Sequence, residues 1–281
     1  MKKTLLAAAL AAAAIAAPAA TPSETAALDA AKQIYAIKGG DLGTFFNALP
    51  ASYQTGVADV VKLFASKIDA KLWTGAQGAL KDVAGAALKK SEFALEGLPE
   101  AERPETIRLI AKAAAVVKAA SYDDLKAGNV AKILSAKPLE MPGVTDQIPA
   151  FKIPEITVKQ NDDGTVAVTA DGDTENFALV EGKWIPKDLA DEFMDNIQEA
   201  KNGLADFEIP AQMKPQLAVL FPMISNTAKR AAKAETKEEF EKTVMTGLMP
   251  IAMVANSLGG GMGGAADDEE EDEEVEYDMA E

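Results

Sequence analysis

The sequence predicts an α+β fold that is mostly helical, with an Ala-rich antiparallel helical array, a small antiparallel β-meander at about 156–186 and C-terminal helices. One observation is that apolar residues recur at helical spacing through most of the 281-residue chain. Another is that apolar and polar residues alternate within 156–186, where Gly-containing turns follow one another. Because a small sheet with one apolar face needs a cover, we expect the flanking helices to pack on it.

The strands of the meander are predicted by the alternation of their side chains. Val166 and Val168 point to one face of the second strand, and Phe177 and Leu179 point to one face of the third. Trp184 is the large apolar side chain of a short fourth strand. Three turn dipeptides separate the strands, and in each we expect Gly to supply a positive φ: Asp163-Gly164, Asp171-Gly172 and Glu181-Gly182.

The start of the chain has the three parts of a secretory signal peptide. Residues 1–3 include two lysines, residues 4–17 are an apolar run rich in Ala and Leu, and Ala17-Pro18-Ala19 has the small-x-small pattern of a cleavage site. The alternative is a membrane anchor, but the run is shorter than the about 20 apolar residues that a spanning helix needs. We therefore expect residues 1–19 to be removed and the product to be periplasmic or secreted, with no integral membrane segment after cleavage.

Residues 20–136 are expected to form the helical array, since short connections favour antiparallel neighbours. The first helix has a capping box, in which Thr21 caps and Glu24 returns a hydrogen bond. Further helix starts are expected at Asp41, Asp69, Arg103 and Ser121.

The helix from Asp69 is expected to bury an apolar side that includes Leu80 and Val83. Each helical Gly costs about 1 kcal/mol relative to Ala. We expect close helix–helix packing to explain the glycines of this helix, and a hinge is the alternative: Gly75, Gly78 and Gly85.

The Pro-rich segment 137–154 is the best candidate for a boundary. It divides the helical region from 137–258, which holds the meander and the C-terminal helices. We expect the two parts to pack together as one globular unit.

Three helices are expected after the meander. Asp188 is expected to cap the first, which would end near Gly203, and a second is expected over 211–234. Thr236 opens a third with a capping box. This last helix carries a stripe of methionines four residues apart, for which we favour core packing or a contact with the preceding helix over an adaptable binding surface or a metal-ion site: Met245, Met249 and Met253.

Charge separates the C-terminal tail from the rest of the chain. The formal charge is −16, and 11 of the residues 267–281 are acidic. After the Gly-rich spacer 259–264, we expect this tail to be disordered, and either to attract a protein partner or to confer solubility. The acidic run that a partner would contact is Asp267, Asp268, Glu269, Glu270, Glu271, Asp272, Glu273 and Glu274. Nucleic-acid binding is disfavoured because it needs a basic surface.

The chain contains no Cys and no His, which removes thiol chemistry, the commonest general base and the commonest transition-metal ligand. Carboxylate, Lys, Tyr, Ser and Thr chemistry remains. The acidic pairs Asp123-Asp124 and Asp191/Asp195 are placed where helices favour carboxylates, and the acidic turns of the meander do not fit a calcium loop. We assign no catalytic, cofactor-binding or metal-binding residue.

The segment from Phe177 to Pro186, FALVEGKWIP, resembles the closing hairpin of exported α+β domains of the cystatin or nuclear-transport-factor-2-like type. The resemblance is confined to the meander and implies a curved sheet wrapped around a long helix. The chain departs from that pattern by placing a large helical array before the sheet and more helices after it. The resemblance therefore assigns no functional residue.

These observations favour an exported, non-enzymatic cell-envelope protein that acts as a binding or interaction module. Two alternatives stay open. One is an enzyme or small-ligand binder that uses carboxylates and Tyr in a pocket between helices and sheet. The other is a periplasmic chaperone-like protein that uses the Met-lined helix.

Overall fold

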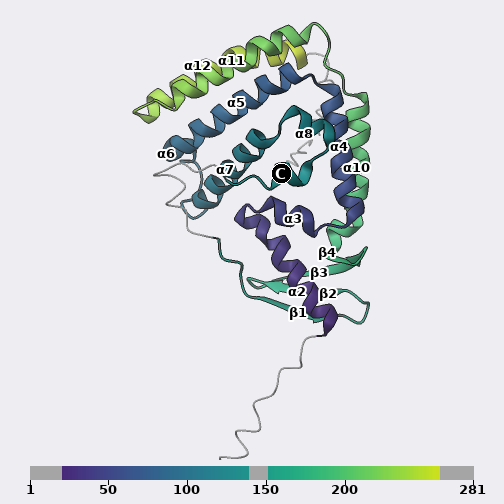
Figure 1. Ribbon diagram of the computed structural model, residues 1–281. Coiled ribbons are helices and arrows are strands. Elements are labelled where there is room, and N and C mark those ends of the chain that lie inside the picture. Colours follow the sequence, from purple (N-terminus) through teal and green to yellow (C-terminus); the bar gives the residue numbers. More distant parts are fainter. Residues whose placement is uncertain (1–20, 139–150, 260–281) are drawn as a thin grey trace, which may run out of the picture.

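The computed structural model describes residues 21–138 and 151–259. The fold is α+β and mostly helical, with a four-stranded antiparallel sheet, as predicted (Figure 1). The helices before the sheet are α2 (Pro22–Tyr35), η1 (Ala36–Gly39), α3 (Leu42–Ala48), α4 (Ala51–Lys67), α5 (Ala70–Lys89), α6 (Ser91–Ala94), α7 (Arg103–Ala119), α8 (Tyr122–Ala127) and α9 (Val130–Leu134). The helices after it are α10 (Lys187–Asp206), α11 (Met213–Ala231) and α12 (Lys237–Gly259). The signal peptide and the acidic tail predicted from the sequence lie outside the described residues.

The sheet is a meander with strand order β1-β2-β3-β4, formed by β1 (Ile156–Gln160), β2 (Val166–Ala170), β3 (Asp173–Val180) and β4 (Lys183–Pro186). Its two tight turns have positive φ at both central residues: 54° and 89° at Asp171 and Gly172, 49° and 76° at Glu181 and Gly182. Such turns match the twist of the strands that they join. The predicted turns are therefore confirmed, and they fix the register of the sheet.

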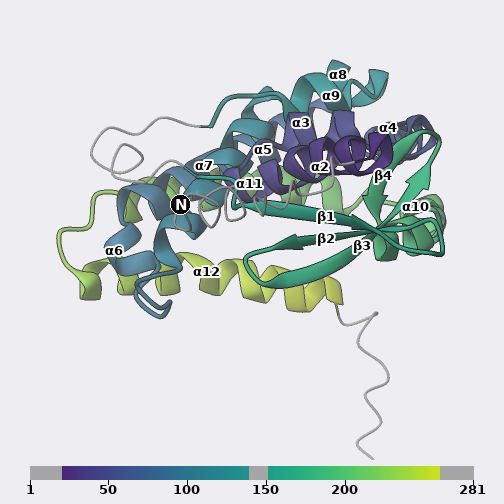
Figure 2. The same ribbon diagram turned by 90° about the horizontal axis from the view of Figure 1, so that it is seen from below.

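One face of the sheet packs against α2. Val166, Val168 and Phe177 are fully buried there, together with Ala27 and Ala31 of α2 (Figure 2). The small side chains of α2 let the helix approach the strands closely. This helix–sheet layer is the main core of the described chain.

The predicted apolar faces of the last two strands are only partly correct. Trp184 is buried in the core, but Leu179 is 57% exposed, although it shares a face of β3 with buried Phe177. Alternation predicts the side on which a side chain lies. It does not predict how far the covering helices extend along the strand.

A helix from before the sheet, α4, lies beside a helix from after it, α10. Along α4 and α10, Tyr53 stacks on Phe193 with ring centroids 4.4 Å apart, and Gly56 faces Ile197. Lys67, at the end of α4, donates to the Ala205 carbonyl near the end of α10. Because residue numbers rise together along both helices, α4 and α10 run parallel (Figure 1).

The next two helices repeat this arrangement. Gly75 of α5 faces Phe221 of α11, and Asp82 lies against Ser225 one to two turns later, so α5 and α11 are also parallel. On the other side of α5, the indole N–H of Trp73 donates to the Ala120 carbonyl beyond the end of α7, at 2.6 Å. Consecutive helices α10 and α11 therefore lie alongside consecutive helices α4 and α5, each parallel to its neighbour.

Helix α12 turns back along α11. Gly247 lies against Thr227 of α11, and Phe240 meets Phe93 of α6 with ring centroids 6.0 Å apart. The hydroxyl of Thr236 accepts from the Glu239 N–H, as predicted, but the Glu239 carboxylate accepts from the Glu235 N–H and not from that of Thr236, so half of the predicted capping box is formed. These contacts hold α12 beside α11 and leave a space between α12 and α5.

The predicted boundaries of α10 are wrong. Asp188 lies in the first turn and Pro186 occupies the cap position, while the helix passes through Gly203 and ends at Asp206. Pro186 is both the last residue of β4 and the cap residue of α10, so no loop separates the strand from the helix. A single helical Gly costs too little to end a helix that packs along its length on α4.

The glycines of α5 do not share one explanation. A Cβ at Gly75 would lie 2.8 Å from Cδ2 of Phe221, so close packing explains this residue. A Cβ at Gly78 or Gly85 would meet no atom within 4 Å. Close packing therefore does not explain these two glycines.

Candidate functional site

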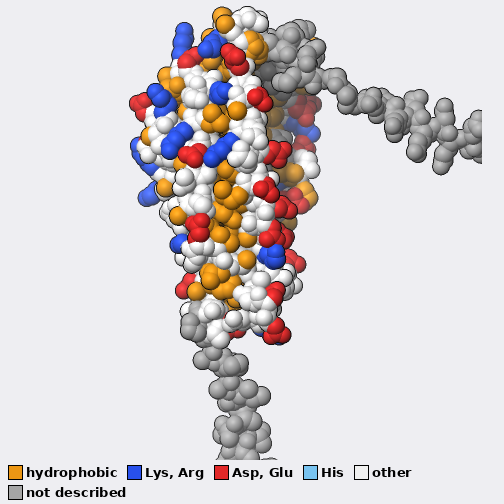
Figure 3. All heavy atoms as spheres, turned by 90° about the vertical axis from the view of Figure 1, so that its right-hand side faces the viewer, with side chains coloured by type: hydrophobic (Ala, Val, Ile, Leu, Met, Phe, Trp, Pro, Cys, Tyr) orange, Lys and Arg blue, Asp and Glu red, His pale blue; other side chains and the backbone are white. Residues whose placement is uncertain are grey.

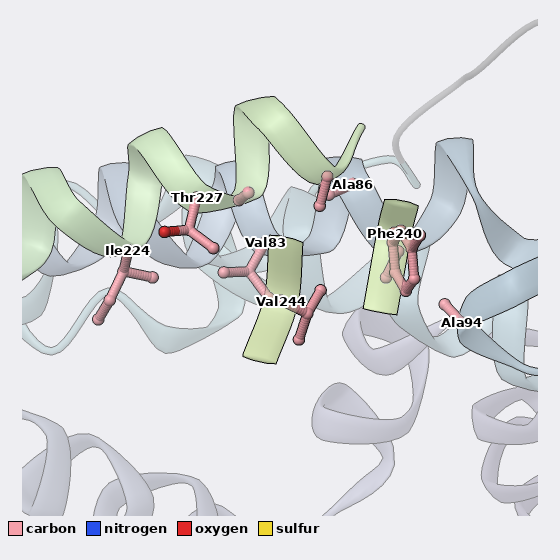
Figure 4. Close-up of a pocket in the computed structure, with 10 residues that line it drawn as sticks. Val83, Ala86, Ala94, Ile224, Thr227, Phe240 and Val244 are labelled. Atoms are coloured by element: carbon pink, nitrogen blue, oxygen red, sulfur yellow. The ribbon is translucent and has the colours of Figure 1, made fainter. Parts of the chain in front are cut away.

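An apolar cavity of about 320 Å³ lies among α5, α6, α11 and α12. Nine of the ten residues that line it are apolar, and Thr227 is the tenth: Val83, Ala86, Ala87, Ala94, Ile224, Thr227, Ala228, Ala231, Phe240 and Val244. Val83 and Val244 face each other from α5 and α12, and Phe240 lies near Ala94 at one end (Figure 4). This cavity is our candidate functional site.

The cavity exists because small side chains line its floor. Ala86 and Ala87 of α5 and Ala228 and Ala231 of α11 reach only a short way toward α12. Thr227 and Gly247 set the approach of α12 to α11, so α12 cannot move sideways without losing that contact. The sequence signal for the cavity is the presence of alanines at these facing positions of α5 and α11.

The apolar side predicted for α5 is not wholly buried. Leu80 is 50% exposed and Val83 is 44% exposed, although both were expected to face the core. Val83 lines the cavity, and Leu80 lies about 60° around the helix from it. The opening between α5 and α12 leaves this side in contact with solvent.

The expected burial of the methionine stripe is also wrong for the residues whose side chains are described. Met245 is 70% exposed and Met249 is 62% exposed. At about 100° per residue, Met245 lies on the far side of Val244 from Gly247, which contacts α11. The pair therefore points away from α11, and the side chain of Met253 lies outside the described residues.

A polar network spans α5 and α11 beside the cavity. The hydroxyl of Ser225 donates to Asp82, and Lys229 Nζ lies 3.1 Å from the same carboxylate and 3.0 Å from Ser225 Oγ. Burial raises the pKa of Asp82, but the hydrogen bonds from Ser225 and Lys229 outweigh it and leave the pKa below its ordinary value. Lys229 is exposed and paired with the Asp82 carboxylate. The network joins two helices.

The acidic pair Asp123-Asp124 does not form an acid–base couple. Asp124 is 8% exposed and accepts hydrogen bonds from Lys132, Asn129 and Ser121, at distances between 2.7 and 2.9 Å. These three donors hold the pKa of Asp124 far below its ordinary range. Asp124 therefore stays ionised, and its role is to connect α8 to Asn129 and to Lys132 of α9.

The other acidic candidates are also held by local structure. Asp163 accepts from the N–H and hydroxyl of Thr165 in the β1–β2 turn. Asp191 pairs with Lys187 one turn before it on α10. Burial raises the pKa of Glu175, which shares its surroundings with Asp188 and Lys38. Within residues 21–138 and 151–259, acidic side chains form no group of three or more that could hold a metal ion.

Lys112 of α7 is the most deeply buried cation described, at 4% exposure. Its Nζ donates to the Ala136 carbonyl at 2.6 Å. Burial lowers the pKa of Lys112, and the nearby Asp41 carboxylate opposes that change. This hydrogen bond holds the backbone just after α9 against α7, and Lys112 does not line the apolar cavity.

A second apolar surface follows α4 and α10. Figure 3 shows a stripe of hydrophobic side chains along this face, with acidic side chains beside it. Met194 of α10 and Phe207 just after it are partly exposed. The concave site beside Phe207 has a mostly polar lining that includes Lys67, Asp206 and Lys214, so the apolar cavity remains the better candidate.

Comparisons with protein families, curated proteins and solved structures found no match to this chain. None of the helices in the described part combines the length and the hydropathy of a membrane-spanning helix.

Proposed function

We propose that this chain is an exported, non-enzymatic binding protein of the cell envelope that takes a small apolar ligand into the cavity between α5, α6, α11 and α12. The observation that carries this proposal is the apolar lining of a cavity of about 320 Å³. Ligand pockets of proteins begin at about 300 Å³ and are lined mostly by apolar side chains. Export is supported by the basic and apolar parts of residues 1–19.

The chemistry of the walls favours a ligand without charge. A charged group would lose its hydration in the cavity, and Thr227 is the single polar side chain among the described lining residues. Apolar cavities of about 150 Å³ bind molecules as small as benzene, so this one has room for a larger apolar body.

The test is binding of a neutral apolar probe, N-phenyl-1-naphthylamine, whose fluorescence rises in apolar surroundings. The protein used is residues 20–281, which lacks the predicted signal peptide. Ala87→Leu places a larger side chain in the cavity. Ala113→Leu makes the same change on the exposed side of α7 and serves as the matched control.

We expect the wild type and Ala113→Leu to bind the probe with equal affinity, and Ala87→Leu to bind it at least about tenfold more weakly. Equal binding by all three proteins would place the probe elsewhere and would refute the proposed site. Thermal unfolding of each variant shows whether it is folded.

Export has its own test. The full chain is produced in a bacterium, and the periplasmic fraction is analysed by N-terminal sequencing. A protein that starts at Ala20 supports the predicted cleavage after Ala19. A protein that keeps Met1 and stays in the cytoplasm would refute it.

A second function, peptide binding by a chaperone-like protein, is favoured by a different observation. Met245 and Met249 are both more than half exposed on α12. Met side chains are flexible and polarisable and suit surfaces that adapt to varied apolar partners. The test is fluorescence anisotropy with a labelled amphipathic peptide of about 18 residues, for which we expect M245Q/M249Q to have a higher Kd than the wild type, and equal binding by both would refute this second function.

A further inference from the structure

We propose that the ligand of the apolar cavity is a neutral apolar molecule with one oxygen-bearing group, an alcohol or a ketone, which forms a hydrogen bond with the hydroxyl of Thr227. This inference rests on the proposed function, because it concerns the same cavity. Two observations carry it: the lack of a hydrogen-bond partner for that hydroxyl and its position toward one end of the cavity (Figure 4).

Thr227 differs from other helical threonines of the chain. Thr55, Thr74 and Thr106 each donate to the carbonyl four residues before them, at distances between 2.8 and 3.0 Å. The Thr227 hydroxyl forms no hydrogen bond to any residue that the structure describes. Since every described side-chain oxygen that is closed off from solvent does have a partner, the Thr227 oxygen is open to a molecule in the cavity that it lines.

This hydroxyl distinguishes between ligands of similar size. A ligand that enters the cavity removes the Thr227 hydroxyl from water, and the other nine lining residues are apolar. A hydrocarbon leaves the hydroxyl without a partner, which costs free energy, whereas an alcohol or a ketone provides one. In apolar pockets a small number of polar groups fixes the orientation of the ligand and selects it.

The charged groups beside the cavity do not favour an ionised ligand. Lys229 Nζ lies 3.1 Å from the Asp82 carboxylate, so the two charges are paired with each other. The described lining of the cavity includes no charged side chain. A carboxylate or an ammonium group would lose its hydration there without gaining an opposite charge, so the oxygen-bearing group is neutral.

The place of the hydroxyl sets the orientation of the ligand. In Figure 4 the Thr227 oxygen lies toward the Ile224 end of the cavity, and Phe240 lies at the other end. The ligand oxygen therefore lies toward Ile224, and the apolar body extends toward Phe240. Because a cavity of about 150 Å³ holds benzene, one of about 320 Å³ holds a molecule of roughly twelve non-hydrogen atoms.

The test compares butyrophenone with butylbenzene, two neutral molecules of about this size that differ only in the carbonyl group next to the ring. Isothermal titration calorimetry with residues 20–281 gives Kd for each. Thr227→Val replaces the hydroxyl with a methyl group, and Thr74→Val makes the same change at an exposed position of α5 as the matched control. Ala87→Leu shows whether each molecule binds in the cavity.

We expect Thr227→Val to weaken butyrophenone binding about fivefold, the effect of one neutral hydrogen bond, and to leave butylbenzene binding no weaker. Thr74→Val should bind both molecules as the wild type does, and Ala87→Leu should weaken both. Thermal unfolding shows whether each variant is folded.

A second measurement needs only the wild type. A hydrogen bond to the ketone moves the NMR resonance of its isotope-labelled carbonyl carbon downfield of its position in hexane. We expect that shift for bound butyrophenone. A resonance at the hexane position would overturn the inference, even if Thr227→Val did not fold.

The other outcomes separate the inference from the function on which it rests. Binding of both molecules that Ala87→Leu weakens and Thr227→Val leaves unchanged would keep the cavity as the ligand site and overturn the role of Thr227. An equal loss of both molecules in Thr227→Val would also overturn that role, because it would be an effect of packing. Binding that Ala87→Leu leaves unchanged, or no binding of either molecule or of N-phenyl-1-naphthylamine, would overturn the proposed function together with the inference.

Discussion

Gly247 of α12 lies so close to Thr227 of α11 that a Cβ atom at Gly247 would overlap the Thr227 side chain. Thr227 also lines the apolar cavity. One contact therefore sets both the spacing of the two helices and one wall of the candidate site.

Gly247→Ala should destabilise the protein by about 1–3 kcal/mol, because the added methyl group overpacks the seam between α11 and α12. The measurement is the free energy of unfolding in urea. Gly78→Ala is the control, since a Cβ there meets no atom within 4 Å. It should stabilise the protein by up to about 1 kcal/mol, the difference in helix propensity. A stabilised Gly247→Ala variant would show that α12 does not pack closely on α11.

Phe177→Ala should destabilise the protein by about 3–5 kcal/mol, because this large side chain is fully buried between α2 and the sheet. Leu179→Ala, two residues later on the same strand, should change the stability by less than about 0.5 kcal/mol, because Leu179 is mostly exposed. Thermal and urea unfolding of both variants measure the difference. Similar losses would mean that α2 covers the whole strand.

Some parts of the fold follow from local sequence and others do not. The turns at Gly172 and Gly182 depend on the conformation of two neighbouring residues, and the cap at Thr21 depends on a residue three positions away, so all were predictable. The pairing of Gly56 with Ile197 joins residues far apart in the chain. No local pattern encodes that pairing.

The apolar cavity could not be predicted from the sequence, because it too depends on contacts between residues far apart in the chain. Helical periodicity correctly predicts that Val83 lies on an apolar side of α5, but its exposure depends on where α12 packs. The position of α12 is fixed by its contacts with α11 and α6, through Gly247 and Phe240. Cavities arise where such distant constraints leave a space unfilled, so they are not visible in periodicity.

Asp124 should stabilise the protein at neutral pH and lose that effect in acid. Its hydrogen bonds to Lys132, Asn129 and Ser121 lower its pKa in the folded state. A lowered folded pKa stabilises the fold above the unfolded value of about 3.9, and this contribution is lost as pH falls from there toward the folded pKa. Asp124→Asn should therefore lower the unfolding midpoint at pH 7, by an amount that shrinks as pH falls below about 4.

The control for Asp124 is Asp123→Asn, which changes the neighbouring exposed carboxylate on the same helix. Urea unfolding at several pH values compares both variants with the wild type. A difference for Asp124→Asn that does not depend on pH would show that shape, and not ionisation, is what the network requires.

Occupation of the cavity should stabilise the protein by mass action. A probe at about 100 times its Kd should raise the free energy of unfolding by about 2.7 kcal/mol, provided that it binds only the folded chain. N-phenyl-1-naphthylamine should do so for the wild type and for M245Q/M249Q, since the two methionines lie outside the cavity lining. Ala87→Leu should show little of this effect, because its larger side chain occupies part of the space. Equal stabilisation of Ala87→Leu, measured by thermal unfolding with and without the probe, would show that the ligand binds outside the space between α5 and α12.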